Sequence, residues 1–107
     1  MTRQELKIHE ASQCLDMTDV RAEIDRLDRS LVRLLSERQR YIERAAEIKS
    51  RRSDIRDQAR IDDVLAKVAG EAAKAGLDAG LARAVWQTLI ERSIEIEFAC
   101  FEAQRSR

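Results

Sequence analysis

Two cations of this chain fall at positions where a helical pattern expects apolar side chains. At about 100° per residue, Arg38 and Lys49 share one helical face with the apolar residues that recur from Val20 to Ala45. The two cations would lie about 16 Å apart along one helix axis. A buried charge is costly unless a partner or a ligand neutralises it. The pattern therefore suits a small anionic ligand, especially a dicarboxylate held by arginine.

A later segment places the opposite charge in the same kind of position. Glu97 falls at the centre of the apolar face of its segment, with Ser93 one turn before it. A carboxyl and a hydroxyl could thus line the same cavity as the two cations. A structural alternative needs no ligand, because Glu97 could form a buried salt bridge with Lys49 or Arg38, or the long side chains could snorkel to the surface.

Two further polar residues could join such a cavity. Arg21 flanks the first apolar stripe but would lie about 25 Å from Arg38 along the axis. Only a twofold-related copy could therefore bring Arg21 to the same pocket. Asp57 opens the next helical segment, on the same side as Ile61 and Val64.

Three helices are predicted to position these residues. The chain has no proline, and its first long segment, from Val20, has no glycine and repeats apolar residues at three- and four-residue spacing. Thr18 and Asp78 are good N-caps, and Gly76 suits a helix C-terminus. The expected elements are a helix from Val20 to about Lys49, a polar connection over 50–57, a helix from about Gln58 to Ala75 and a helix from about Ala79 to Gln104. We therefore expect an all-α chain with a flexible N-terminal arm over residues 1–17 and a helical domain over 18–107.

The first helix is too long for a compact monomer. It would span roughly 48 Å, whereas a compact domain of 107 residues is only about 35 Å across. Another chain must therefore cover part of its apolar stripe. An intertwined homodimer of three-helix chains is the simplest arrangement, and a plain helical bundle dimer without chemistry would satisfy the same geometry.

Composition argues against several classes of function. The 20 basic and 20 acidic residues cancel, which does not favour nucleic-acid binding. The only feature that supports nucleic-acid binding is the basic run from Lys49 to Arg56, and such a run is usually a solvated loop. No segment is apolar enough for a membrane span or a signal peptide. Cys14 and Cys100 are too few for a disulfide scaffold, and with His9 they cannot supply four metal ligands. We therefore expect a cytoplasmic protein with no metal site.

The same segments resemble the all-helical, AroQ-class chorismate mutases over about residues 18–100. The corresponding runs are VRAEIDRLDRSLVRLLSERQRYIERAAEIK, IRDQARIDDVL, GLD and LIERSIEIE. They contain an arginine in R-x-x-I-D, an E-R pair near the middle of the first helix, a lysine eleven residues later and R-D at the start of the second helix. The resemblance implies an intertwined dimer of three-helix chains and the rearrangement of chorismate to prephenate without a metal or cofactor.

The resemblance also implies roles for individual residues. Arg38 would bind one substrate carboxylate, and Arg21 of the partner subunit would bind the other. Lys49 and Glu97 would contact the ether oxygen of the substrate and are the expected catalytic residues. The remaining positions that would line the site are Asp57, Ile61 and Ser93.

Two positions depart from the pattern of the family. Many bacterial members carry Gln where this chain has Glu97, and a glutamate can donate a hydrogen bond to an ether oxygen only when it is protonated. Where true mutases often have a glutamate that contacts the substrate hydroxyl, this chain has Ile61. Ile61, Tyr41, Ala45 and the leader with Cys14 are similar to the isochorismate pyruvate lyase branch, although those lyases keep Gln at the Glu97 position. A mutase, a salicylate-forming lyase and a non-enzymatic helical interaction module are thus all open from sequence.

Overall fold

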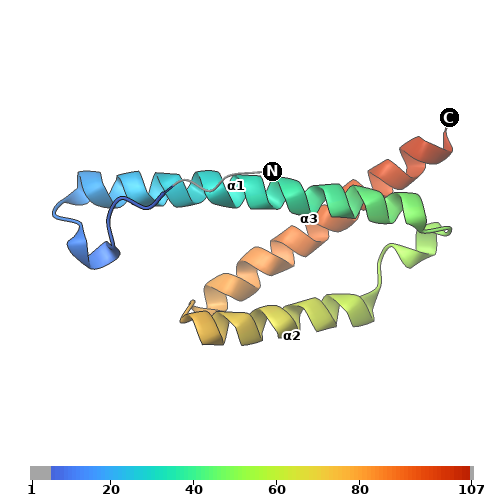
Figure 1. Cartoon of the computed structure of the whole chain (residues 1–107). Helices are drawn as coiled ribbons and strands as arrows, with labels where there is room; N and C mark the ends of the chain where they lie inside the picture. The colour runs from blue at the N-terminus through green and yellow to red at the C-terminus, as the bar shows by residue number, and fades with distance from the viewer. Residues whose placement is uncertain (1–5, 107) are drawn as a thin grey trace. The chain divides into compact units, whose positions relative to one another are not determined.

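The structure is a computed structural model that describes residues 6–106, and these residues are all-α (Figure 1). Its elements are η1 (Ala11–Gln13), α1 (Met17–Ile48), η2 (Arg52–Asp54), α2 (Gln58–Ala75) and α3 (Ala79–Arg105), where η marks a short 3₁₀ helix. The predicted three helices with a long first one are confirmed. Residues 1–5 of the expected arm, and Arg107, lie outside the described residues.

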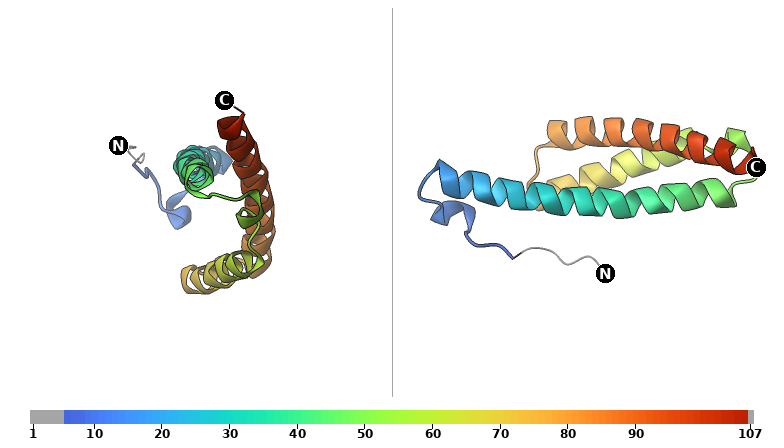
Figure 2. Two further views of the ribbon diagram at one scale, coloured as in Figure 1. Left: turned by 90° about the vertical axis from the view of Figure 1, so that its right-hand side faces the viewer. Right: turned by 90° about the horizontal axis from the view of Figure 1, so that it is seen from above.

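The chain divides into two compact units, one ending at Arg40 and the other beginning at Tyr41. The helix α1 contributes to both units, whereas α2 and α3 belong to the second. Within the second unit, α2 and α3 pack against each other. The chain reverses its direction at the tight turn that joins them, so both helices extend to the same side of that turn (Figure 2).

The first helix begins earlier than predicted, because Asp16 and not Thr18 caps it. The Asp19 N–H donates to the Asp16 carboxylate at 3.0 Å, and the Asp19 carboxylate accepts from the Leu15 N–H at 3.0 Å. This exchange satisfies backbone donors that have no partner within the helix. Thr18 lies inside the first turn of α1, so its predicted role as N-cap was wrong. Aspartate and threonine are both good N-caps, and here the carboxylate of Asp16 occupies the N-cap position.

The described part of the arm contacts α1 at Glu23. The Glu23 carboxylate accepts hydrogen bonds from the backbone N–H of Ile8 at 3.4 Å and from the Arg26 side chain at 3.2 Å. Burial alone would raise the pKa of Glu23, but the bonds from Arg26 and from the backbone of Ile8 and His9 hold that pKa below its ordinary value of 4.5. An ionised Glu23 is therefore an anchor for the arm.

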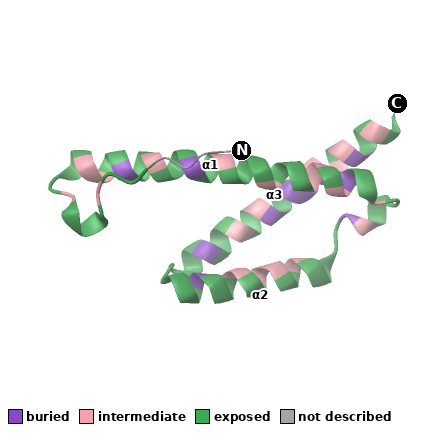
Figure 3. Ribbon diagram, viewed as in Figure 1, coloured by how far each residue is buried: buried purple, intermediate pink, exposed green. Residues whose placement is uncertain are grey.

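The apolar stripe of α1 is open to solvent in the first unit. Exposed surface dominates this helix (Figure 3). Ile24, Leu27, Leu31 and Leu35 are each between 45% and 54% exposed. A contiguous exposed apolar surface on a folded chain commonly marks an interaction site. This exposure agrees with the expectation that a second chain covers the stripe, and the homodimer itself stays a prediction.

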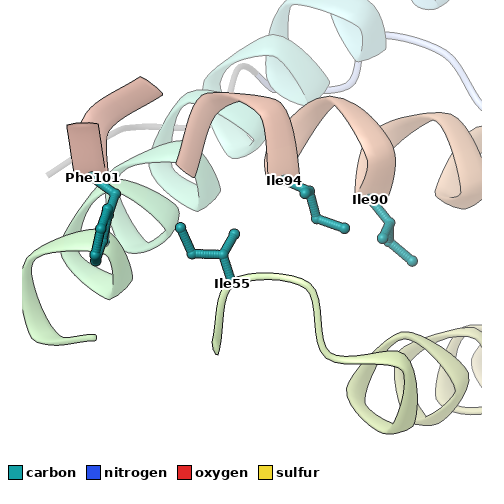
Figure 4. Close-up of a cluster of buried hydrophobic side chains, with 5 residues drawn as sticks. Ile55, Ile90, Ile94 and Phe101 are labelled. Atoms are coloured by element: carbon teal, nitrogen blue, oxygen red, sulfur yellow. The ribbon is translucent and has the colours of Figure 1, made fainter. Parts of the chain in front are cut away.

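The second unit closes a core with its own residues. Ala46, near the end of α1, is fully buried, and Ile55, Ile90, Ile94 and Phe101 are 4% to 8% exposed (Figure 4). Ile55 is the one apolar residue of the connection between α1 and α2, which its composition predicts to be polar. Burial of such a side chain stabilises by about 1.5–3 kcal/mol. The connection is therefore anchored to the core.

Capping bonds set the ends of α2 and α3. The Asp57 carboxylate accepts a hydrogen bond from the Arg60 N–H at 3.1 Å, and the Asp78 carboxylate accepts one from the Leu81 N–H at 2.9 Å. Gly76 ends α2 in the left-handed region, with φ 72°, where glycine has no steric penalty. The predicted bounds of α2 and the predicted caps at Gly76 and Asp78 are confirmed, and α3 extends one residue beyond the prediction, to Arg105.

Candidate active site

Lys49 and Glu97 form an ion pair in the second unit. The Nζ atom of Lys49 lies 2.7 Å from Oε2 of Glu97. The side chain of Glu97 is only 6% exposed, and that of Lys49 is 30% exposed. The carboxylate is thus almost wholly enclosed by protein, while the ammonium keeps partial contact with solvent.

The end of one helix and the buried face of another position this pair. Lys49 directly follows α1, and its N–H still donates to the Ala45 carbonyl at 3.0 Å. Glu97 lies on the face of α3 from which Ile94 and Phe101 enter the core. Residues three and four apart share a helix face. The packing that fixes α3 therefore also fixes the direction of the Glu97 side chain.

Ser93 belongs to the same face of α3, one turn before Glu97. It is 8% exposed, so its hydroxyl is enclosed by protein like the carboxylate. A hydroxyl can both donate and accept a hydrogen bond. Among the predicted site residues, the structure therefore joins Lys49 to Glu97 directly and places Ser93 on the face that carries Glu97.

The electrostatics of the pair allow two uses. One buried carboxylate against one ammonium is balanced in charge, as in a structural salt bridge. An arriving anion would compete with Glu97 for Lys49, because both are negative and the ammonium has three donors. The arrangement can therefore offer an anionic ligand the ammonium donor of Lys49 beside the enclosed carboxyl of Glu97.

Asp57 and Ile61 have structural roles at the start of α2. Asp57 is exposed and supplies the N-cap. Ile61 packs against the core cluster and lines a cavity of about 350 Å³ between α2 and α3, together with Arg56 and Arg83. The structure explains both residues without a ligand, and their place in the active site stays a prediction.

Arg21 and Arg38 both lie on the part of α1 that belongs to the first unit. Arg21 is exposed, and Arg38 is half-buried. Lys49 and Glu97 belong to the second unit. A pocket that contains all four residues stays a prediction.

Two arginines that sequence analysis does not single out, Arg52 and Arg105, make contacts to residues far away in the sequence. Arg105 donates to the Lys49 carbonyl at 2.6 Å. Arg52 bonds to Glu102 at 3.0 Å, with its guanidinium 4.4 Å from the centroid of the Phe98 ring. From the sequence, Arg52 is one of several basic residues in a polar segment, and Arg105 is a cation in the last turn of a helix, where cations are favoured. No periodicity reveals which distant backbone atom such a side chain reaches.

Two negative findings concern the part of the chain that the structure describes. Within residues 6–106, no group of three or more His, Cys, Asp or Glu side chains is placed to hold a metal ion. In that same range, no helix combines the length and the apolar character that a membrane crossing requires.

Comparison with known proteins gives one family match. The sequence pattern of the chorismate mutase type II family matches residues 20–98. The match includes all of α2, most of α1 and the greater part of α3. It leaves out the N-terminal arm and the last turns of α3, including Arg105. A search of curated proteins found no match to the chain.

Proposed function

We propose that this chain, which belongs to the chorismate mutase type II family, rearranges chorismate to prephenate. The family is an isomerase family, and membership implies chorismate as the substrate. The observation that carries the proposal is the contact between Lys49 and the enclosed carboxyl of Glu97. A cation and an acid against one small volume can stabilise a negative charge that develops between them.

The reaction asks the protein for orientation and electrostatics. It is a Claisen rearrangement, in which a C–O bond breaks while a C–C bond forms within one molecule. The substrate must be held in a compact diaxial conformation, and fixing that geometry removes much of the entropic barrier. Partial negative charge builds on the ether oxygen as the C–O bond breaks. Donors aimed at that oxygen therefore bind the transition state more tightly than the substrate.

Lys49 and Glu97 are the groups that meet this developing charge. Lys49 donates to the ether oxygen and to a substrate carboxylate. Once Lys49 turns to the substrate, Glu97 is an enclosed carboxyl without its cation, and in its protonated form it donates to the same oxygen. Their present separation of 2.7 Å supports a common target.

Carboxylate binding falls to the arginines. Arg38 binds one substrate carboxylate, and Arg21 of the partner subunit binds the other, because guanidinium forks match carboxylates in shape and charge. Asp57, Ile61 and Ser93 complete the lining. A homodimer then has two functions, which are to cover the exposed stripe of α1 and to complete each site.

An isochorismate pyruvate lyase is the second candidate. The observation in its favour is Ile61, an apolar residue packed against the core where a mutase glutamate would contact the substrate hydroxyl. The same cationic clamp would hold isochorismate while a hydrogen moves to the departing pyruvate, leaving salicylate.

One experiment separates the candidates. The purified chain is incubated with chorismate and, separately, with isochorismate, and prephenate, salicylate and pyruvate are followed. Prephenate formed from chorismate as the faster reaction supports the mutase. Faster salicylate and pyruvate formation from isochorismate would make the lyase the main activity. Absence of turnover with both substrates would favour a non-enzymatic helical interaction module.

A further inference from the structure

The C-terminus of α1 lacks the capping features that end α2. The last carbonyls of a helix have no partner within it and need one from elsewhere. α2 obtains partners from Gly76, whose N–H bonds to the carbonyls of Ala72 and Ala73, and it has the basic residue Lys74 in its last turn. α1 has no basic residue in its last turn, and no glycine follows it before Gly70.

Arg105 from the end of α3 supplies what α1 lacks. Its Nη2 donates to the Lys49 carbonyl at 2.6 Å, and its Nη1 donates to the Ala46 carbonyl at 3.4 Å. The guanidinium lies 3.5 Å from the centroid of the Phe101 ring, which is itself buried in the core. A planar cation that stacks on a fixed ring and bonds through two nitrogens has a defined orientation. Its positive charge is also attracted to the negative, C-terminal end of the α1 dipole.

Helix α3 therefore contacts both the side chain and the backbone of Lys49. Glu97 accepts from its ammonium, and Arg105 donates to its carbonyl. Glu97, Phe101 and Arg105 follow one another at four-residue spacing, so they share one side of α3. A lysine side chain is long and flexible, and fixing its backbone limits the volume that Nζ can reach.

We propose that Arg105 is a positioning residue that fixes the backbone of Lys49 and so restricts its ammonium to the volume beside Glu97. The proposal rests on the proposed function, in which Lys49 is catalytic, and it goes beyond the family match, which ends at residue 98. Arg105 acts through the Lys49 backbone and is not itself expected to contact the substrate.

The kinetic test uses Arg105→Gln, the conservative Arg105→Lys and a control, Arg92→Gln. Arg92 is also an arginine of α3, but it pairs with Glu95 on its own helix. We expect Arg105→Gln to lower kcat about tenfold with KM little changed, because a misplaced donor is missed mainly in the transition state. Arg105→Lys should recover only part of kcat, since an ammonium cannot bridge two carbonyls in one plane. The control should match the wild type.

A second measurement is independent of turnover. The ¹⁵Nζ ammonium signal of Lys49 is followed by NMR at mildly acidic pH and low temperature, and it is assigned by its loss in Lys49→Arg. The other lysines are Lys7, Lys67 and Lys74. We expect Arg105→Gln to shift this signal and to speed its proton exchange with water, while Arg92→Gln leaves it in place.

The two measurements distinguish failure of the inference from failure of the proposed function. If the wild type is inactive on both substrates, the function fails, and the Lys49 signal alone decides whether Arg105 positions that residue. An unchanged Lys49 signal in Arg105→Gln overturns the inference, whatever happens to stability or kcat. A rise in KM at constant kcat also overturns it. If Arg105→Gln does not fold, Arg105→Lys carries both measurements, with a smaller shift and a smaller loss of kcat expected.

Discussion

The two units of this chain bury their apolar side chains to different degrees. In the second unit, Ala46 is fully buried and Phe101 is 7% exposed. In the first, Leu31 is 54% exposed and Leu35 is 45% exposed. One part of the chain closes a core by itself, and the other presents an apolar stripe to solvent. The proposed site divides in the same way, with its arginines on the first unit and its Lys49–Glu97 pair on the second.

The largest expected effect is on the pair in the second unit. Lys49→Ala should lower kcat on chorismate about a thousandfold, because it removes the donor to the developing charge. Thermal stability should fall as well, since the enclosed Glu97 loses its cation, so kcat is compared at a temperature at which circular dichroism shows the variant to be folded. The control is Lys67→Ala, which removes an exposed lysine that pairs with Asp63 on its own helix. Turnover of Lys49→Ala at the wild-type rate would remove Lys49 from the mechanism.

The next effect concerns the stripe of the first unit. Leu31→Asp should weaken the dimer about a hundredfold, since it places a charge where each copy buries a leucine. Sedimentation equilibrium over a concentration series measures the change. Val32→Asp is the matched control, because Val32 is the neighbouring residue, lies off the stripe and is 66% exposed. A wild-type monomer, or equal dimer stability in both variants, would contradict this reading of the stripe.

A smaller effect tests the acid of the pair. Glu97→Gln keeps a hydrogen-bond donor at this position through its amide, so its kcat should stay within about tenfold of the wild-type value. Glu97→Ala offers no donor and should lose more of kcat. Equal losses of kcat in the two variants would count against a donor role for Glu97.

The smallest effect concerns the arm of the first unit. Burial raises the pKa of Glu23, whereas the bond from Arg26 and, after it, the backbone bonds of the arm lower that pKa. Because part of the lowering comes from the docked arm, protonation of Glu23 favours the undocked arm. Docking should therefore be complete near neutral pH and should be lost progressively as the pH falls below 4.5. The backbone N–H signal of Ile8 in NMR reports the change, and Glu23→Gln should weaken the contact already at neutral pH. An Ile8 signal that is constant down to about pH 3 would disprove the anchor.

Features that depend on neighbouring residues could be predicted from the sequence. The bounds of α2, the left-handed Gly76 and the cap at Asp78 follow from local backbone chemistry, which the chain displays within a few residues. The start of α1 was misjudged because Asp16 and Thr18 are both competent caps, and sequence does not rank two acceptors so close together. The division into an arm over 1–17 and a domain over 18–107 stays a prediction.

Features that depend on distant residues were only partly predictable. Helical periodicity placed Lys49 and Glu97 on apolar faces, and a salt bridge between them was one of the interpretations it allowed. The burial of Ile55 could not be predicted, because the composition of the connection is polar and the conformation of its turn determines which side chain enters the core. The reach of Arg105 to the Lys49 carbonyl depends on how α3 returns to the end of α1, and no spacing encodes it.

The shared site, in which Arg21 of one copy joins Arg38 of the other, is the part of the proposed function that subunit mixing tests most directly. Arg21→Ala and Arg38→Ala should each be nearly inactive as homodimers. After mixing and subunit exchange, about half of the dimers are hybrids and each hybrid has one intact site, so about a quarter of the wild-type activity should return. Hybrid dimers verified by mass spectrometry that show no recovery would contradict the shared site.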